Sequence, residues 1–141
     1  MGKNMLLTFK SNIDNEETGK DTIEFMTTAD FVKKNNKYYV TFSDMESFET
    51  DNTKTTLKIE GDKITLLRFG ANNAQFIFKQ GQEYKSHYET PYGAFSMAVF
   101  SEEVTVDIND EGGDLSVLYD VYLNGLKTQR NDLKINLKLP S

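Results

Sequence analysis

Few residues in this chain have side chains suited to catalysis. The 141 residues include no cysteine, which excludes nucleophilic cysteine chemistry, and one histidine, His87, which any Ser-His-acid triad would have to use. In a β-strand His87 would share its face with Lys85 and Glu89, and such a face is typically exposed to solvent. We therefore predict a surface position for His87, no catalytic residue and no enzymatic activity. Paired carboxylates on neighbouring strands would not be visible in one sequence, so glycoside hydrolysis stays an open alternative.

One segment imitates a metal site. Residues 107–112 place oxygen ligands at alternate positions and a glycine at the sixth, as in the first half of a calcium-binding loop. The twelfth position is Leu118, where such a loop needs a bidentate glutamate. With one histidine and no cysteine, a structural zinc site also lacks adequate ligands. We predict a hairpin tip at residues 107–112, and no metal or cofactor.

Arg68 departs from its local pattern. It has the same strand phase as Ile64 and Leu66, so a fold that buries those two side chains turns Arg68 inward as well. The planar fork of donors on a guanidinium suits a carboxylate or a phosphate. Three interpretations stay open: a side chain that reaches water from a strand end, a structural ion pair in the interior, and an anchor for an anionic ligand.

Apolar and polar residues alternate with a period of two along almost the entire chain, which indicates β-strands. Clear examples are residues 5–9, 38–42, 115–123 and 133–139. Turn-forming sequences separate the runs, and Gly61, Gly81 and Gly125 are expected to supply the positive φ that tight hairpins need. No run is patterned as a helical crossover, so the strands must be antiparallel. One helical turn at residues 28–34 is the alternative to a strand there.

A meander of this length has two exposed edges unless it closes on itself, and closure removes the aggregation hazard of those edges. The sequence therefore predicts an all-β protein: a closed antiparallel up-and-down β-barrel of about eight to ten strands, in a single domain at residues 1–141. Such a barrel is either hollow or filled by large side chains, and the ten phenylalanines and seven tyrosines are numerous enough to fill it.

Charge and composition exclude several classes of partner. The net charge is −6 and only two of the 16 basic residues are arginine, whereas a nucleic-acid-binding protein needs a basic stripe. We find no run long enough for a membrane span and no signal-peptide pattern at the start of the sequence. We expect a cytoplasmic protein that binds no nucleic acid; the sequence identifies no protein partner.

Several segments carry a family resemblance. Five segments occur in an order and spacing that resemble the YwiB-like family. They are residues 55–59, the run Leu67-Arg68-Phe69-Gly70, residues 88–97 with the turn Tyr88-Glu89-Thr90-Pro91-Tyr92-Gly93, residues 113–119 and residues 131–135. This is an uncharacterised family of Gram-positive bacteria. The resemblance extends from about Leu7 to Leu139 and implies a calycin-like, or lipocalin-like, β-barrel. It also implies the habit of such barrels to carry small amphipathic ligands, and it implies no reaction.

Two functions follow from the two kinds of interior. A hollow barrel would bind a small hydrophobic or amphipathic molecule, and the residues predicted to contact it are Arg68, Phe78, Tyr88, Met97 and Tyr119. A filled barrel would instead act as an interaction module that meets a basic partner through its acidic outer face. The interior of the barrel decides between them.

Overall fold

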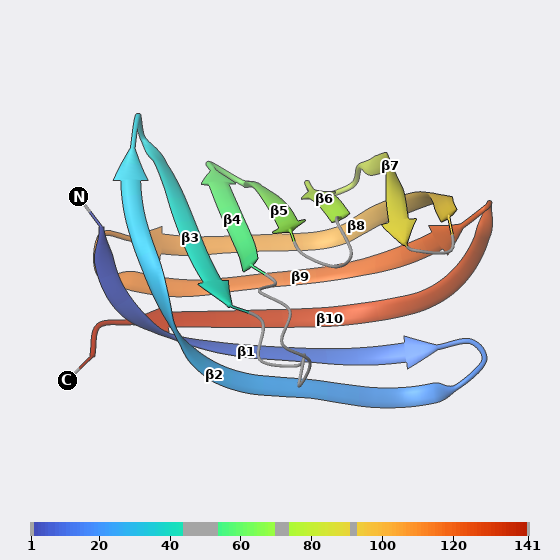
Figure 1. The fold of residues 1–141 in the computed structure, drawn as a ribbon, viewed down its shortest axis with the longest axis horizontal. Helices are drawn as coiled ribbons and strands as arrows, with labels where there is room; N and C mark the ends of the chain where they lie inside the picture. The colour runs from blue at the N-terminus through green and yellow to red at the C-terminus, as the bar shows by residue number, and fades with distance from the viewer. Residues whose placement is uncertain (1, 44–53, 70–73, 91–92, 141) are drawn as a thin grey trace.

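The computed structural model describes residues 2–43, 54–69, 74–90 and 93–140; the side chains at 69, 74, 86–90 and 94–95 lie outside this description. The described residues form ten β-strands (Figure 1). In chain order the strands are β1 (Lys3–Asn15), β2 (Gly19–Lys34), β3 (Lys37–Ser43), β4 (Lys54–Glu60), β5 (Lys63–Phe69), β6 (Ala74–Phe78), β7 (Glu83–Thr90), β8 (Gly93–Asn109), β9 (Gly112–Leu123) and β10 (Leu126–Lys138).

All ten strands belong to one antiparallel sheet, ordered β6-β5-β4-β3-β2-β1-β10-β9-β8-β7. Each strand pairs with its neighbour in sequence, except that β6 and β7 share no ladder in the described part of the chain. The first and last strands close the ring instead, with Leu6 opposite Lys138 and Asn15 opposite Gln129. The result is a nearly closed barrel with a seam between β6 and β7, which confirms the all-β antiparallel prediction.

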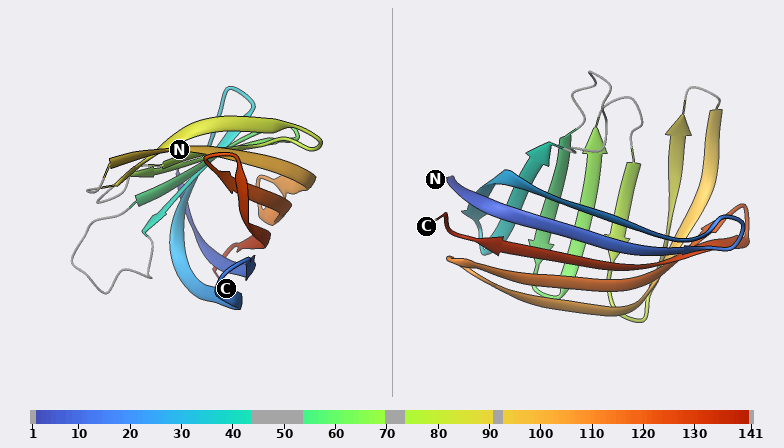
Figure 2. Two further views of the ribbon diagram at one scale, coloured as in Figure 1. Left: turned by 90° about the vertical axis from the view of Figure 1, so that its right-hand side faces the viewer. Right: turned by 90° about the horizontal axis from the view of Figure 1, so that it is seen from below.

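The barrel consists of long curved strands on one side and short strands on the other. Strands β1, β8, β9 and β10 curve together along the length of the molecule, and β3 to β6 cross over them (Figures 1 and 2). Strand β2 belongs to both groups, because residues 19–31 pair with β1 and residues 30–34 pair with β3. The interior lies between these two groups of strands.

Three of the predicted turns have the backbone conformation that the sequence indicated. Gly61, Gly81 and Gly125 have φ values of 59°, 77° and 86°, which confirms the positive φ expected of them. The alternative of a helical turn at residues 28–34 is wrong, because this segment continues β2. Ala29 and Phe31 alternate with more exposed neighbours and are almost fully buried, as in a strand with one face on the core.

A β-bulge in β8 changes which residues face inward. Met97 and Val99 are buried before the bulge and Val104 after it, so the inward positions shift from odd to even numbers. The extra residue is Glu102, and its carboxylate accepts a 2.7 Å hydrogen bond from Nη2 of Arg130 on β10. The bulge therefore keeps apolar residues inside along a strand of 17 residues.

The segment that imitates a calcium loop is a hairpin tip, as predicted. Strand β8 ends at Asn109 and β9 begins at Gly112, so Asp110 and Glu111 form the turn. Asp110 contacts the other side of the barrel: its carboxylate accepts a hydrogen bond from the Tyr38 hydroxyl and lies 3.4 Å from Nζ of Lys33. The tip of this hairpin is therefore joined to β2 and β3 at one end of the barrel.

Candidate functional site: the barrel interior

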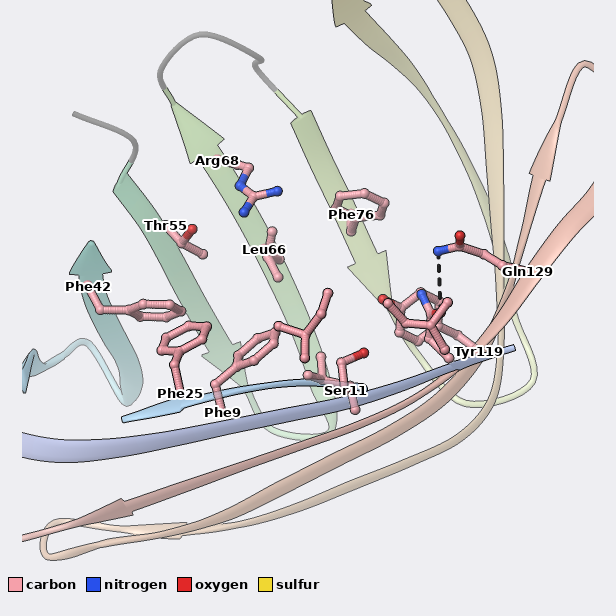
Figure 3. Close-up of a pocket in the computed structure, with 14 residues that line it drawn as sticks. Phe9, Ser11, Phe25, Phe42, Thr55, Leu66, Arg68, Phe76, Tyr119 and Gln129 are labelled. Carbon is pink, nitrogen blue, oxygen red and sulfur yellow. Dashed lines mark hydrogen bonds between the residues drawn. The ribbon is translucent and has the colours of Figure 1, made fainter. Parts of the chain in front are cut away.

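The barrel interior contains two adjoining cavities of about 200 Å³ and 280 Å³. They share five lining residues: Arg68, Phe76, Tyr119, Gln129 and Asn131. The first cavity extends from this junction toward β1, β2 and β3 (Figure 3). The second extends toward Met97, Val121, Leu123 and Thr128, so it lies between β5–β6 on one side and β8–β10 on the other. The interior is therefore partly hollow, and four of the five residues at the junction are polar.

The wall of the first cavity that faces away from the junction is aromatic. Phe9 and Phe25 are opposite each other on β1 and β2, and their rings stack with centroids 4.8 Å apart. Phe42 on β3 continues the row, 6.2 Å from the ring of Phe25 (Figure 3). All three side chains lie on the inward phase of their strands, because the same phase carries Leu7 on β1, Phe31 on β2 and Val40 on β3 in the core. This wall suits an apolar group.

Polar side chains occupy inward positions where a barrel core would normally be apolar. Ser11, Thr55 and Asn131 are at most 5% exposed and line the first cavity. Ser11 follows Leu7 and Phe9 in strand phase, and Asn131 precedes Leu133 and Ile135. A buried polar group that lacks a partner costs free energy, so these residues mark the part of the interior where hydrogen bonds are made.

Three side chains from β1 and β10 form a chain of hydrogen bonds that ends at Tyr119. Nδ2 of Asn15 donates to Oε1 of Gln129 at 3.4 Å. Nε2 of Gln129 donates to Oδ1 of Asn131 at 3.3 Å, and this bond is the dashed line in Figure 3. Asn131 interacts in turn with the Tyr119 side chain, and this interaction lowers the pKa of Tyr119.

Tyr119 stays protonated at neutral pH. Burial inside the barrel raises the pKa of Tyr119 above its ordinary value, and this effect outweighs the opposing effects of Asn131 and of the positive charge on Arg68. The part of the side chain that remains accessible faces the cavities. Tyr119 is therefore a neutral hydrogen-bond donor next to a cation.

Arg68 faces the cavities from β5. Its side chain is half-buried, and its guanidinium points from the strand into the space between Thr55 and Phe76 (Figure 3). Ile64, in the same phase, is buried in the core and Leu66 lines the first cavity, so Arg68 faces inward as the shared phase predicted. The geometry thus places a permanent positive charge beside an aromatic cavity.

The structure brings together three of the five side chains that the sequence singled out. Arg68 and Tyr119 both line the junction of the two cavities, and Met97 lines the second cavity. Phe78 is 1% exposed and lies in the core behind Tyr119, with ring centroids 4.7 Å apart. Tyr88 lies on β7, but its side chain is outside the described residues, as is that of His87.

Sequence reasoning missed the polar side chains of the interior. Ser11, Thr55, Gln129 and Asn131 all contribute to the first cavity. A signal for them was present, because each is a polar residue on the apolar phase of a strand, the same signal that singled out Arg68. Small polar residues are common on strands, so the signal is weaker for them than for an arginine.

Two further features bear on the chemistry. Within the described residues, no three His, Cys, Asp or Glu side chains are grouped closely enough to hold a metal ion. In the same part of the chain, no helix has the length and apolar character needed to cross a membrane.

Comparison with known proteins gives the family. A family model described as "Domain of unknown function (DUF1934)" matches residues 7–135. The chain is 24% identical over 120 residues to the "Uncharacterized beta-barrel protein YwiB" of Bacillus subtilis (strain 168), across 85% of this chain and 83% of that protein. It superposes on the crystal structure of ywiB protein from Bacillus subtilis with a TM-score of 0.86 and 21% identity, covering 99% of this chain and 94% of the other, so the two share a fold. The resemblance read from the sequence is confirmed, and because the family model covers nearly the whole chain, this protein belongs to the DUF1934 family.

Proposed function

We propose that the protein is a binding protein that holds a small amphipathic molecule inside its barrel. The observation that carries the proposal is the division of the interior into an aromatic wall, formed by Phe9, Phe25 and Phe42, and a polar junction around Arg68. Small-molecule sites are typically apolar cavities in which a few polar groups converge to fix orientation. This interior has both parts.

The cavities favour ligand binding over the alternative of a filled interaction module. The two volumes, about 200 Å³ and 280 Å³, adjoin at shared residues, and ligand sites begin at about 300 Å³. Close-packed interiors contain few voids larger than a water molecule. An occupant would recover the contacts that the aromatic side chains lack in the empty barrel. The proposal includes the cytoplasm as the place of action, since a chain without cysteine suits a reducing compartment.

Thermal unfolding in the presence of candidate ligands tests the proposal. The panel consists of a fatty acid, a small aromatic acid, a sterol, haem and a flavin, and native mass spectrometry of the purified protein checks for a co-purified adduct. A ligand present at about a hundred times its Kd should stabilise the protein by about 2.7 kcal/mol, which raises Tm by about 5–10 °C for a domain of this size.

A pair of variants separates interior binding from binding elsewhere. Ser11→Met puts a long side chain into the first cavity and should abolish the ligand-induced rise in Tm, measured against its own ligand-free Tm. The matched variant Lys10→Met changes the adjacent, exposed position on the outer face and should leave the rise intact. If no ligand of the panel raises Tm and native mass spectrometry finds no adduct, the results favour the filled interaction module.

A further inference from the structure

The junction and the first cavity together define a more specific ligand than an amphipathic molecule in general. We propose, building on the proposed function, that the barrel is selective for small aromatic carboxylates: a single six-membered ring joined by a short chain to an acid. The ring lies against the row of Phe9, Phe25 and Phe42, and the carboxylate lies between Arg68 and Tyr119.

The volume of the first cavity sets the size of the apolar part. An apolar cavity of about 150 Å³ lined by leucine, isoleucine and phenylalanine is large enough to take benzene. The first cavity measures about 200 Å³ and is lined by the same residue types at its apolar end. It therefore accommodates one substituted ring, whereas the tail of a long-chain fatty acid is several times the length of such a ring.

The aromatic wall favours a planar occupant over an aliphatic one. Phe9 and Phe25 stack with an interplanar angle of 14°, and Phe42 is tilted by 46° relative to Phe25. A ring that enters beside this row can meet one face edge-on or offset, which are the arrangements that aromatic pairs prefer and which add to the free energy of area burial. A flexible alkyl chain gains the burial without this contribution.

The donors at the junction favour an anionic head group. A guanidinium has five N–H donors, so Arg68 can hold a carboxylate while it keeps the contacts it has within the protein. Tyr119 is neutral because burial raises its pKa, so its hydroxyl can donate a hydrogen bond to an oxygen of the ligand. A bound carboxylate would receive a charge-assisted bond and a hydroxyl bond at the same place.

Gln129 and Asn131 orient Tyr119 rather than contact the acid in this arrangement. Their amides belong to the chain that starts at Asn15, in which Asn15 donates to Gln129 and Gln129 donates to Asn131. The second cavity, which opens from the same junction toward Met97 and Leu123, gives the ligand room for a substituent on the acid side.

Isothermal titration of the full chain with three probes tests the selectivity without any variant. The probes are 3-phenylpropanoate, its uncharged analogue 3-phenylpropan-1-ol, and hexadecanoate. We expect the acid to bind at least about tenfold more tightly than the alcohol, as a charge-assisted hydrogen bond would give, and more tightly than hexadecanoate. Equal affinity for the acid and the alcohol would overturn the assignment of the head group.

Variants then test which side chains donate hydrogen bonds to the carboxylate. Arg68→Met should weaken 3-phenylpropanoate binding by about tenfold or more and change alcohol binding by less than about threefold. Tyr119→Phe should weaken the binding of 3-phenylpropanoate by about three- to tenfold. The control Lys54→Met also removes one positive charge, but from an exposed position on β4, next to Thr55, which pairs with Arg68. It should change the affinity for the acid and for the alcohol by no more than about twofold.

The outcomes distinguish this inference from the function on which it rests. If hexadecanoate binds more tightly than the aromatic acid, or if Arg68→Met leaves acid binding unchanged, the aromatic-carboxylate assignment is wrong while interior binding stands. If none of the three probes binds and Ser11→Met alters no ligand response in the wider panel, both proposals fail.

Discussion

The hydroxyl of Tyr38 donates a 2.8 Å hydrogen bond to the carboxylate of Asp110, across 72 residues of sequence. The contact joins β3 to the tip of the β8–β9 hairpin, and Lys33 and Lys3 reach the same turn: Nζ of Lys33 lies 3.4 Å from the Asp110 carboxylate, and Nζ of Lys3 donates to the Asp110 carbonyl oxygen at 3.1 Å. Three strands from the start of the chain therefore meet one late hairpin at this end of the barrel.

The Tyr38–Asp110 pair makes stability depend on pH at both extremes. The hydrogen bond from Tyr38 and the nearby Lys33 lower the pKa of Asp110, so the stabilisation is present above the ordinary aspartate range and is lost as the pH falls through the lowered value. The same hydrogen bond raises the pKa of Tyr38, so that contribution is present below the ordinary tyrosine range of about 10 and is lost as the pH rises through the raised value.

Tyr38→Phe should remove the acid-side effect. We expect the pKa of Asp110 to move up toward its ordinary range, because the largest cause of its low value is lost while Lys33 remains. Carboxyl-carbon NMR titration of both proteins measures this change directly. Glu60 serves as the internal control, because its low pKa depends on Lys37 and Lys58 and should not move. An unchanged Asp110 pKa would contradict the assigned contact.

Two glycines with positive φ should differ in what an alanine costs. At Gly93, with φ of 127°, an added Cβ meets no atom of the described residues within 4 Å, so Gly93→Ala should cost only the backbone strain of about 1–2 kcal/mol. At Gly113, with φ of 141°, the Cβ would overlap the carbonyl oxygen of Asp107 on β8, and the ladder must shift. Gly113→Ala should cost about 3–5 kcal/mol, the range of severe core changes. Urea unfolding ranks the two, and equal losses would show that the β8–β9 ladder yields easily.

Arg130 should hold the β8 bulge and the largely buried carboxylate of Asp120 together. Its Nη1 lies 3.1 Å and 3.2 Å from the two oxygens of Asp120, and its Nη2 binds Glu102. Arg130→Met should destabilise the protein by about 1–3 kcal/mol, because Asp120 loses its principal donor. Lys127→Met is the matched control: Nζ of Lys127 lies 3.6 Å from Asp120, beyond hydrogen-bond distance, so the cost should stay below about 1 kcal/mol. A larger loss from Lys127→Met than from Arg130→Met in urea unfolding would reverse this assignment.

Replacement of Ser101 by alanine should stabilise the protein. Its side chain is fully buried opposite Tyr119, and its hydroxyl has no hydrogen-bond partner within the described chain. The backbone N–H and C=O of Ser101 bond to Gln82 and Gly81, so Ser101→Ala removes only the unsatisfied group. We expect a stabilisation of about 1 kcal/mol in urea unfolding. Ser116→Ala, on a half-buried position of β9, should change stability by less than about 0.5 kcal/mol. A loss on Ser101→Ala would indicate that a buried water satisfies the hydroxyl.

The sequence predicted the strands well because their pattern is local. Alternation at residues 38–42 and 133–139 and the glycines at 61, 81 and 125 specify strands and turns through near neighbours alone. Even the β8 bulge leaves a trace, since the apolar phase changes from Val99 to Val104.

The closure of the barrel and the composition of its interior were harder to predict. Pairing of Leu6 with Lys138 and the seam at β6–β7 are long-range choices that no local pattern encodes. Likewise, nothing near Ser11 or Asn131 in sequence says that the two share a cavity with Arg68, because β1, β5 and β10 supply them from distant segments. The alternation in the sequence shows which residues face inward. Which residues become neighbours inside the barrel depends on the pairing register of all the strands.

The position of the seam has a consequence for how the chain folds. The pairing of β1 with β10 requires closure of a loop that spans nearly the whole chain, and such non-local pairing slows folding. Joining Lys138 to Lys3 by a short linker and opening the chain between Phe78 and Glu83 would yield the strand order β7 to β10 followed by β1 to β6, in which every ladder joins consecutive strands. This circular permutant keeps all the ladders and lowers the contact order, and it should therefore fold faster than the natural chain at similar stability.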